Sequence, residues 1–452
     1  MDKKEEIVLG FMKDKDYVPM KAKEIAMILG VPKKEYPNFL KILDNLENSF
    51  KIGKNKKNKY RVIEENYQEG IYRRNAKGFG FVKIEGQEDE VYISKENSMQ
   101  ALNGDKVLVE IIEEKNKIKS AEGKIKRIIK REKDTVVGTF QNNRTFGFVV
   151  PDDRNFGTDI FISKNDFGKA RNGHKVLVKI TKYPSKGKKA EGKIIEVLGG
   201  PNEAGVDMLS LIKEYNLPYR FPEPVVKEAE SFGDKIDKKE IEKRVDLRDN
   251  IIFTIDGEDA KDLDDAVRVV KLENGNYRLD VHIADVSHYV KEGSLLDREA
   301  LIRGTSIYML GRVIPMIPRQ LSNGLCSLNA GQDRLTLSCI MEINSKGDVV
   351  SSEVYKSVIR VTERMNYHDV QKIIDRSDNE VLKKYEKYIK DFDLMAELAN
   401  ILKEKRLSNG YLNLDIPESK IELDIQGRPV SVGRYETSFS NEIIEQFMLS
   451  AN

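Results

Sequence analysis

The sequence predicts a multidomain α+β protein in which a small helical domain, two similar β-barrels and a mixed α/β domain follow one another. Three observations lead to this prediction. The chain has 452 residues, more than one hydrophobic core usually organises, so three or more domains are expected. A set of short strand-like motifs occurs twice, with an offset of 69 residues for all but the first motif, and apolar strands around a dense acidic stretch begin after residue 244.

Composition indicates a protein that folds in water. Hydrophobic residues make up 39% of the chain and charged residues 34%. No apolar run approaches the roughly 18 residues that are needed to cross a bilayer, and the charged N-terminus is unlike a signal peptide. Cys326 and Cys339, the two cysteines, imply no disulfide framework. We therefore expect no membrane segment and a reducing, cytoplasmic compartment.

The charges are unevenly distributed, although the net charge is only +2. Lys51–Arg61 contains six basic residues and no acidic one. Asp256–Asp265 contains six acidic residues and one lysine. This distribution predicts a polyanion-binding region ahead of a metal-binding region.

Residues 1–65 are predicted to form three helices and a basic hairpin. The third helix carries Phe39, Leu43 and Leu46 at helical spacing, and Gly30 is a plausible stop before it. The lysine-rich hairpin follows between Phe50 and Val62. Together these features resemble a winged helix-turn-helix. The alternative is a small helical bundle with a solvated lysine loop.

The internal repeat predicts two domains of one kind, at residues 66–131 and 132–200. The matching motifs are Lys77–Val82 with Thr145–Val149, Val91–Lys95 with Ile160–Lys164, Asn103–Val109 with Asn172–Val178, and Glu122–Ile125 with Glu191–Ile194. Each copy consists of short alternating strands broken by Gly and Asn. This pattern is typical of a small closed β-barrel.

Each copy also carries three aromatic residues that can share one face of the barrel. They are Phe79, Phe81 and Tyr92 in the first copy and Phe146, Phe148 and Phe161 in the second. Exposed rings on such a sheet stack on unpaired bases, and flanking cations would contact phosphates. The alternative is that these rings form the barrel core. Two copies that both have basic neighbours favour binding of RNA or single-stranded DNA, and the pattern resembles cold-shock domains, which are OB-folds.

The remaining residues are predicted to form a connector and an α/β domain. Residues 201–243 contain helical segments separated by prolines, and we expect this helical connector to pack on the α/β domain after it. Ile251–Ile255 is a buried strand. Ala266–Val270 and Tyr277–Ile283 form a hairpin around Asn274-Gly275, which is a strong turn signal.

Four carboxylates in the acidic stretch are candidate metal ligands: Asp256, Asp262, Asp264 and Asp265. Carboxylates at the ends of apolar strands repel one another, so they must be solvated, protonated or neutralised by cations. Mg²⁺ prefers such oxygens and keeps open positions for water or phosphate, and two such ions can promote phosphodiester hydrolysis. Asp262 and Asp264 share a face if the segment is extended, so all four converge only if it loops. The alternative is a solvated acidic turn.

The strings around these aspartates are specific enough to suggest a family. They are Arg244–Asp249, Thr254–Asp265, His282–Val290, Gly304–Tyr308, Arg312–Pro318 and Leu325–Leu328. They resemble the catalytic domain of the ribonuclease II family. The winged helix and two cold-shock-like domains in front narrow the resemblance to its bacterial ribonuclease R branch.

The resemblance implies a reaction and roles for individual residues. The family hydrolyses RNA processively from the 3′ end to nucleoside 5′-monophosphates. The four aspartates match its active site, where they would hold one or two Mg²⁺ ions, with Mn²⁺ as a substitute, and Asp262 and Asp264 would serve the chemical step. Tyr308 matches a tyrosine that stacks on a base near the 3′ end. The implied partners are single-stranded RNA and structured RNA with a 3′ tail, bound by a monomer.

Two departures from the family pattern shape the expectations for this chain. In the family, the catalytic domain continues beyond the position of Asn452 and adds an arginine and an S1 domain, so we expect residues 244–452 to be an incomplete catalytic domain that binds RNA and hydrolyses it poorly. Leu414 stands near the position where relatives often have an aromatic base-stacking residue. The alternative function is therefore a non-catalytic RNA-binding or strand-opening protein.

Overall fold

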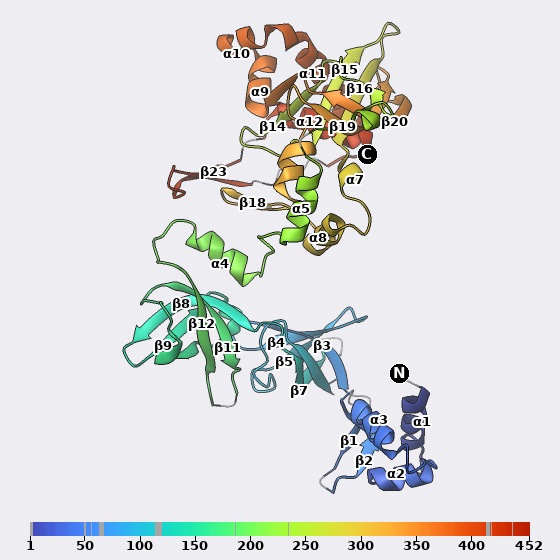
Figure 1. Cartoon of the computed structure of the whole chain (residues 1–452), viewed down its shortest axis with the longest axis vertical. Coiled ribbons are helices and arrows are strands. Elements are labelled where there is room, and N and C mark those ends of the chain that lie inside the picture. The colour runs from blue at the N-terminus through green and yellow to red at the C-terminus, as the bar shows by residue number, and fades with distance from the viewer. Residues whose placement is uncertain are drawn as a thin grey trace. The chain divides into compact units, whose positions relative to one another are not determined.

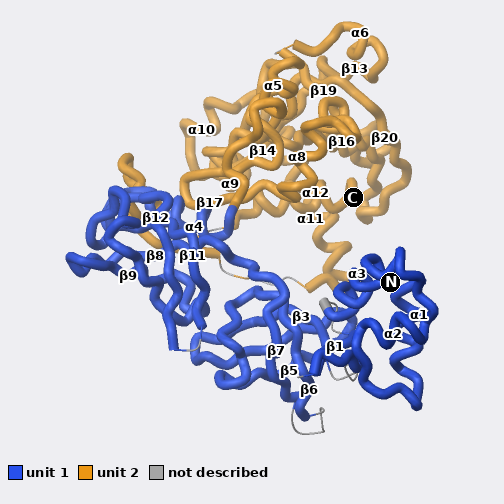
Figure 2. The backbone as a smooth tube through the Cα atoms, turned by 60° about the horizontal axis from the view of Figure 1, so that its bottom comes forward, with its two compact units in different colours: residues 1–216 blue, residues 217–452 orange. Residues whose placement is uncertain are grey.

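The computed structural model forms two compact units, residues 1–216 and residues 217–452 (Figure 2). The residues that it describes are 3–48, 51–55, 57–62, 67–113, 120–185, 187–233, 235–412, 416, 418–435 and 437–452. In this described part, no helix is both long and apolar enough to cross a membrane.

The first domain is a winged helix, as predicted. Its elements are α1 (Lys3–Met12), α2 (Ala22–Ile28), α3 (Tyr36–Asn48), β1 (Ile52–Lys54) and β2 (Tyr60–Val62). All three helices and both strands contribute buried residues to one core, in which Phe39, Leu43 and Leu46 lie on one face of α3. The antiparallel pair of β1 and β2 is the predicted basic hairpin. Lys54 in this hairpin is ion-paired with Glu47 at 2.7 Å, and Lys56 lies outside the described residues.

The repeat forms two closed five-stranded barrels (Figure 1). The first contains β3 (Tyr67–Arg74), β4 (Gly80–Ile84), β5 (Glu90–Ile93), β6 (Lys106–Glu113) and β7 (Glu122–Lys130). The second contains β8 (Thr135–Asn143), β9 (Phe146–Pro151), β10 (Ile160–Ser163), β11 (Lys175–Lys182) and β12 (Ala190–Gly199), with short 3₁₀ turns at Arg154–Phe156 and Lys164–Asp166. The strands close in the order β3-β4-β5-β7-β6 and in the equivalent order β8-β9-β10-β12-β11. The predicted repeat is thus one topology used twice.

The connector divides between the two units. Helix α4 (Val206–Glu214) belongs to the first unit, and its Val206 packs with Val137, Leu177 and Leu198 of the second barrel. The expectation that the connector packs on the α/β domain is therefore wrong for α4. It is confirmed for α5 (Glu223–Ser231), whose buried residues join a core of the second unit.

The second unit is built on a seven-stranded mixed sheet. Its strands are β13 (Val245–Asp246), β14 (Phe253–Asp256), β15 (Asp265–Lys271), β16 (Tyr277–Ala284), β19 (Asp333–Ile343), β20 (Val349–Arg360) and β21 (Glu363–Asn366). The order across the sheet is β13-β20-β19-β16-β15-β14-β21. The β13–β20 and β14–β21 pairs are parallel, and the others are antiparallel. The predicted hairpin at Asn274-Gly275 is confirmed, with Gly275 at a φ of +84°.

Two hydrophobic cores lie between this sheet and the helices of the unit. The first core lies with α9 (Tyr367–Asp375), α11 (Ile389–Ser408) and α12 (Phe439–Ala451). The second lies with α5, α7 (Val286–Tyr289) and α8 (Leu295–Arg303). The remaining elements are α6 (Lys238–Ile241), α10 (Asn379–Lys384), a π turn (Leu321–Leu325), a 3₁₀ turn (Glu386–Tyr388), and two hairpins formed by β17 (Ile307–Met309) with β18 (Arg312–Ile314) and β22 (Ser419–Leu423) with β23 (Pro429–Arg434).

Candidate active site and base-stacking rings

The acidic stretch connects β14 to β15, which are neighbouring antiparallel strands. Asp256 is the last residue of β14, and Asp265 is the first residue of β15. Residues 257–264 form a loop without regular structure, which we call the aspartate loop. Leu263, between two of the aspartates, is fully buried in the second core of the unit. The loop that the aspartates require in order to approach one another is therefore present.

The aspartate loop is hydrogen-bonded to the segment after the π turn. The Ser327 hydroxyl donates to the carbonyl of Lys261 at 2.9 Å and accepts from the amide of Leu263 at 3.2 Å. The amide of Leu328 donates to the carbonyl of Leu263 at 2.8 Å. These contacts hold Leu263 against the core and leave the side chains on either side of it free to face a cavity.

Asp262 and Asp264 line the same cavity, as their shared face predicts. The cavity has a volume of about 310 Å³, and Tyr308, Ser306 and Cys326 also line it. Its apolar wall comes from α7, α8 and the segment after β18, through Val286, Val290, Ala300, Leu301, Met316 and Ile317. Burial raises the pKa of the Cys326 thiol to about 12, so this cysteine stays protonated at neutral pH and is no nucleophile.

Asp256 lines a second cavity. Its volume is about 730 Å³, and the loop residues Gly257–Ala260, Tyr367 of α9 and Lys420 of β22 also line it. Asp265 lines neither of the two cavities. The structure therefore pairs two of the four predicted ligands in one cavity and places a third beside another.

The carboxylates nevertheless influence one another strongly. Burial, together with the charges of Asp265, Asp264 and Asp262, raises the pKa of Asp256 to about 7, although Arg364 acts in the opposite direction. Desolvation and the charges of Asp262 and Asp265 raise the pKa of Asp264 to about 6, even though part of its surface faces solvent. Burial also raises the pKa of Asp265. Ionising this group of carboxylates is thus unfavourable without a neutralising partner.

These properties fit a cation, although the ligand set is not assembled. The Oδ2 atom of Asp256 is buried and has no hydrogen-bond partner. A divalent ion would satisfy such an oxygen and relieve the mutual repulsion of the carboxylates. Within the described ranges, however, no three His, Cys, Asp or Glu side chains converge as a metal site. The four-aspartate Mg²⁺ site therefore stays a prediction.

Tyr308 lies beside the carboxylates on the β17–β18 hairpin. Its hydroxyl donates to Asp262 Oδ2 at 2.8 Å, and this hydrogen bond is the main reason that the pKa of Tyr308 rises to about 12. The residue remains 68% exposed. Its ring is therefore accessible to a base while its hydroxyl touches a candidate ligand. Leu414, the other residue singled out near the base-stacking position, lies outside the described residues.

The three predicted rings form one cluster on each barrel. In the first barrel, the centroids of Phe79, Phe81 and Tyr92 are 5.8–5.9 Å apart. In the second, those of Phe146, Phe148 and Phe161 are 5.5–6.0 Å apart. All six side chains are half-buried and are not part of the barrel cores. The alternative that these rings fill the barrel interior is therefore wrong. Their stacking on bases stays a prediction.

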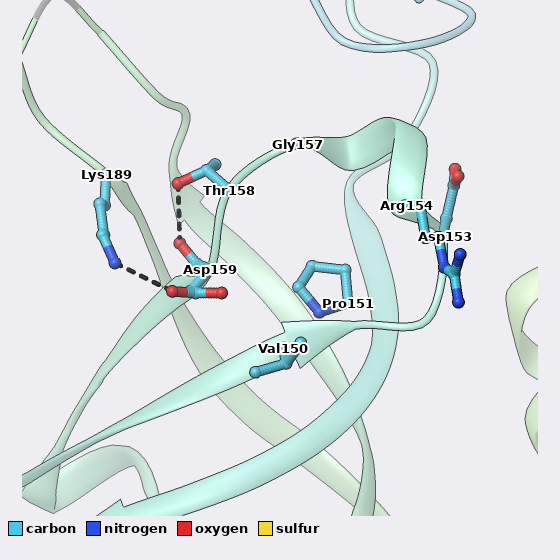
Figure 3. A pocket seen from close by; sticks show the side chains of 8 residues that line it. All are labelled: Val150, Pro151, Asp153, Arg154, Gly157, Thr158, Asp159 and Lys189. Carbon is cyan, nitrogen blue, oxygen red and sulfur yellow. Dashed lines mark hydrogen bonds and ion pairs between the residues drawn. The ribbon is translucent and has the colours of Figure 1, made fainter. Parts of the chain in front are cut away.

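A charged hollow adjoins the rings of the second barrel. It has a volume of about 470 Å³ and is lined by Val150, Pro151, Asp153, Arg154, Gly157, Thr158, Asp159 and Lys189 (Figure 3). Lys189 is ion-paired with Asp159 at 2.9 Å, and its ammonium lies 4.7 Å from the centre of the Phe148 ring. A cation therefore lies beside one of the three rings of the second barrel.

Sequence reasoning missed two residues that hold the aspartate loop. Ser327 lies 64 positions from Leu263 and was part of a family string without a role of its own. Arg364 of β21 donates from Nη2 to the carbonyls of Glu258 and Ala260 at 2.8 and 2.7 Å. No local pattern marks either residue, because each acts on backbone atoms of a distant segment.

Comparisons with known proteins agree with this arrangement. A family model described as the RNB domain matches residues 244–452. A cold shock domain model matches residues 148–222, and a ribonuclease B OB domain model matches residues 70–128. Among solved structures, the Mycoplasma genitalium RNase R in complex with ribose-methylated single-stranded RNA superposes with a TM-score of 0.77 at 25% identity, over 85% of this chain and 60% of that one. The yeast pseudonuclease Ssd1 shares the fold, with a TM-score of 0.60 at 17% identity, over 95% of this chain and 55% of that one.

Curated relatives are similar along nearly the whole chain. Ribonuclease R of Thermotoga maritima is 40% identical over 447 residues, which are 98% of this chain and 62% of that protein. Ribonuclease R 1 of Lactococcus lactis is 38% identical over 99% of this chain and 56% of its own length. The chain thus spans 56–62% of the length of these two relatives. In the order of its domains and along nearly its whole length, the chain is therefore similar to ribonuclease R, and its residues 244–452 match the RNB domain.

Proposed function

We propose that this protein is an exoribonuclease that hydrolyses single-stranded and structured RNA processively from the 3′ end, using Mg²⁺ and releasing nucleoside 5′-monophosphates. The substrate would be RNA with a single-stranded 3′ tail. The proposal includes a monomeric protein in the cytoplasm, where two free cysteines remain reduced.

One observation carries the proposal: Asp262 and Asp264 share a cavity with an exposed tyrosine ring. A cavity of about 310 Å³ lies at the lower end of the volumes that small-molecule ligands occupy. Its apolar wall can cover the faces of a terminal base, and Tyr308 can stack on that base. The carboxylates then lie next to the terminal phosphodiester.

The chain's own residues would orient the reacting groups. Asp256, Asp262, Asp264 and Asp265 would hold Mg²⁺, which when bound supplies Lewis-acid stabilisation of the phosphate and an activated water. The Tyr308 hydroxyl keeps the Asp262 carboxylate in one orientation before substrate binds. The ring clusters of the two barrels would bind unpaired bases without regard to sequence, so the strand can advance after each cleavage.

Likeness to a pseudonuclease supports a second candidate, RNA binding without cleavage. Ssd1 has the same fold and is described as a pseudonuclease, so the fold alone does not decide activity. The retention of all four aspartates in this sequence favours the catalytic alternative. The titrations of Asp256 and Asp264 are perturbed as those of functional carboxylates often are.

The test uses oligoadenylate with Mg²⁺, 5′-labelled to follow shortening and uniformly labelled to follow mononucleotide release, and compares wild type with Asp264→Asn. Wild type should bind the RNA and shorten it slowly from its 3′ end, releasing mononucleotides. Asp264→Asn should bind the RNA equally well and release none. Asp259→Asn is the matched control, because Asp259 is an exposed carboxylate of the same loop and is not one of the four. Cleavage by Asp264→Asn would refute the aspartate assignment, and RNA binding without cleavage by wild type would favour the second candidate.

A further inference from the structure

We propose that Ser327 and Arg364 are positioning residues that set the geometry of the aspartates by fixing the two halves of the aspartate loop. This inference rests on the proposed function, because it concerns how the carboxylates are presented to a divalent ion. Neither side chain touches the reacting atoms. Each acts through backbone atoms of the loop.

The loop has little structure of its own. Inside it, the amide of Ala260 donates to the carbonyl of Gly257 at 3.1 Å. The other described hydrogen bonds of its backbone go to residues outside the loop. The directions of its side chains therefore depend on partners elsewhere in the fold.

Ser327 is hydrogen-bonded to the backbone on both sides of Asp262. Its hydroxyl donates to the carbonyl of Lys261 and accepts from the amide of Leu263, the peptide groups on either side of Asp262. Ser327 is completely buried, its amide donates to Gly324 at 3.1 Å, and its carbonyl accepts from Arg334 Nε at 2.7 Å. The Ser327 hydroxyl is therefore held in place and fixes both peptide groups beside Asp262. The side chain of Asp262 consequently points in one direction.

The same segment fixes the peptide before Asp264. The carbonyl of Leu263 accepts from the amide of Leu328 at 2.8 Å, and the carbonyl of Asp264 accepts from the amide of Ala284 at 2.9 Å. Asp262 and Asp264 therefore face their shared cavity from a backbone that is held at both residues.

Arg364 fixes the other half of the loop relative to Asp256. It stands on β21 opposite Thr254 of β14, the strand that ends at Asp256. From there Nη2 donates to the carbonyls of Glu258 and Ala260. The guanidinium thus holds the first half of the loop, by hydrogen bonds, against β21 and the neighbouring strand β14 that ends at Asp256.

Together the two residues determine the separation between Asp256 and the Asp262–Asp264 pair. Metal ligands must be held to within a fraction of an ångström, and residues that orient ligands typically change metal affinity 10–100-fold when removed. Ser327 and Arg364 are the residues placed to do this here, one on each half of the loop.

The test is a Mn²⁺ titration of the complete 452-residue chain, followed by electron paramagnetic resonance and compared with thermal unfolding. Ser327→Ala and Arg364→Lys should each weaken Mn²⁺ binding by about tenfold or more. Arg364→Lys retains the positive charge and changes an exposed side chain, so it tests the hydrogen-bond geometry without putting the fold at risk.

Ser357→Ala is the matched control for loss of a buried hydroxyl. Ser357 is also completely buried and hydrogen-bonds Thr336 and Ser338 of the same sheet, away from the loop. Ser357→Ala should lower the thermal stability of the protein and leave its Mn²⁺ affinity unchanged. If wild type binds Mn²⁺ and both Ser327→Ala and Arg364→Lys bind it equally well, the positioning role is refuted while the proposed function stands. If wild type binds no Mn²⁺ at the aspartates, as judged against Asp264→Asn, the proposed function fails and this inference fails with it.

Discussion

Among single residues, Tyr308 combines an exposed ring with a hydroxyl that donates to a candidate metal ligand. The two features serve different purposes. The ring can stack on a base, whereas the hydroxyl fixes the Asp262 carboxylate. Substitutions that separate the ring from the hydroxyl distinguish these purposes.

Tyr308→Ala should lengthen the smallest RNA that remains at the end of digestion, because the last nucleotides lose a stacking partner. Tyr308→Phe keeps the ring and should leave the end product unchanged, while it frees the Asp262 carboxylate. Denaturing gels of a labelled RNA digested to completion measure both effects. An unchanged end product for Tyr308→Ala would contradict the stacking role.

The carboxylates predict a dependence of metal binding on pH. The pKa of Asp256 is about 7 and that of Asp264 is about 6. A divalent ion must displace the protons, so Mn²⁺ affinity should fall as pH decreases through 7 and more steeply below 6. Mn²⁺ titrations between about pH 8.5 and 5.5, a range that brackets both pKa values, measure this. An affinity that stays flat down to pH 6 would show that these groups do not bind the ion.

The raised pKa values of Asp256 and Asp264 also predict how the stability of the metal-free protein depends on pH. Stability should decrease as pH rises, whereas metal affinity should increase. A carboxyl group whose pKa is higher in the folded than in the unfolded chain stabilises the fold fully below its unfolded value, near 4. That stabilisation is lost as pH rises through 6 and 7, where Asp264 and Asp256 ionise in the fold. Bound Mg²⁺ should reverse this loss, since it stabilises the ionised forms.

At the scale of elements, the ring clusters depend on the glycines between the rings. In β9, Gly147 stands between Phe146 and Phe148 with its α-carbon facing the barrel interior. A Cβ at this position would lie 2.4 Å from Phe140 Cε2 and 2.9 Å from the Gln141 carbonyl oxygen. Gly80 has the equivalent place in the first barrel, against the ring of Tyr72. The repeated Phe-Gly-Phe motif thus places two rings on the outer face of each barrel. Its glycine leaves room in the interior for one buried ring, Tyr72 in the first barrel and Phe140 in the second.

Gly147→Ala should therefore destabilise the second barrel by about 1–3 kcal/mol, the usual effect of overpacking a core. Because the chain has several domains, a single unfolding free energy is not well defined. Hydrogen exchange measured peptide by peptide should show faster exchange in β8–β10 and unchanged exchange in the winged helix. Gly10→Ala is the control, because a Cβ at Gly10 meets no atom within 4 Å. Equal protection of β9 in both variants would contradict this packing argument.

At the scale of the whole molecule, the two compact units divide the proposed tasks. The winged helix and both ring clusters lie in residues 1–216, and all four aspartates lie in residues 217–452. The division falls at Asn216, a non-glycine residue with a φ of +49°, just before Leu217-Pro218. RNA binding and metal binding should therefore be separable.

Residues 1–216, produced alone, should bind single-stranded RNA and show no Mn²⁺ site, whereas residues 217–452 should bind Mn²⁺. Fluorescence anisotropy with labelled oligoadenylate and a Mn²⁺ titration of each piece measure this. The RNA affinity of the first piece should decrease with salt, because it depends on phosphate contacts. RNA binding confined to the second piece would contradict the role of the ring clusters.

Local patterns in the sequence were sufficient to predict the two barrels, one hairpin and the facing of several side chains. The 69-residue offset predicted two barrels of one topology, because equal spacing of strands and turns produces equal pairing. The alternation of side chains along a strand predicted that Phe79 and Phe81 share a face, and likewise Asp262 and Asp264. The Asn-Gly pair predicted the hairpin in the seven-stranded sheet, because the turn requires a positive φ.

Only the tertiary structure decided which distant groups meet. Helix α4 packs on the barrel before it, since its apolar face fits Val137 and Leu198 there, and no local pattern tells which neighbour a helix will cover. Asp256 lies beside a different cavity from Asp262 and Asp264. Ser327 and Arg364 reach that loop from segments 64 or more residues away. Sequence thus determined the local conformation and the facing of each element, whereas the path of the chain through the fold determined which carboxylates, rings and backbone groups lie within hydrogen-bonding distance.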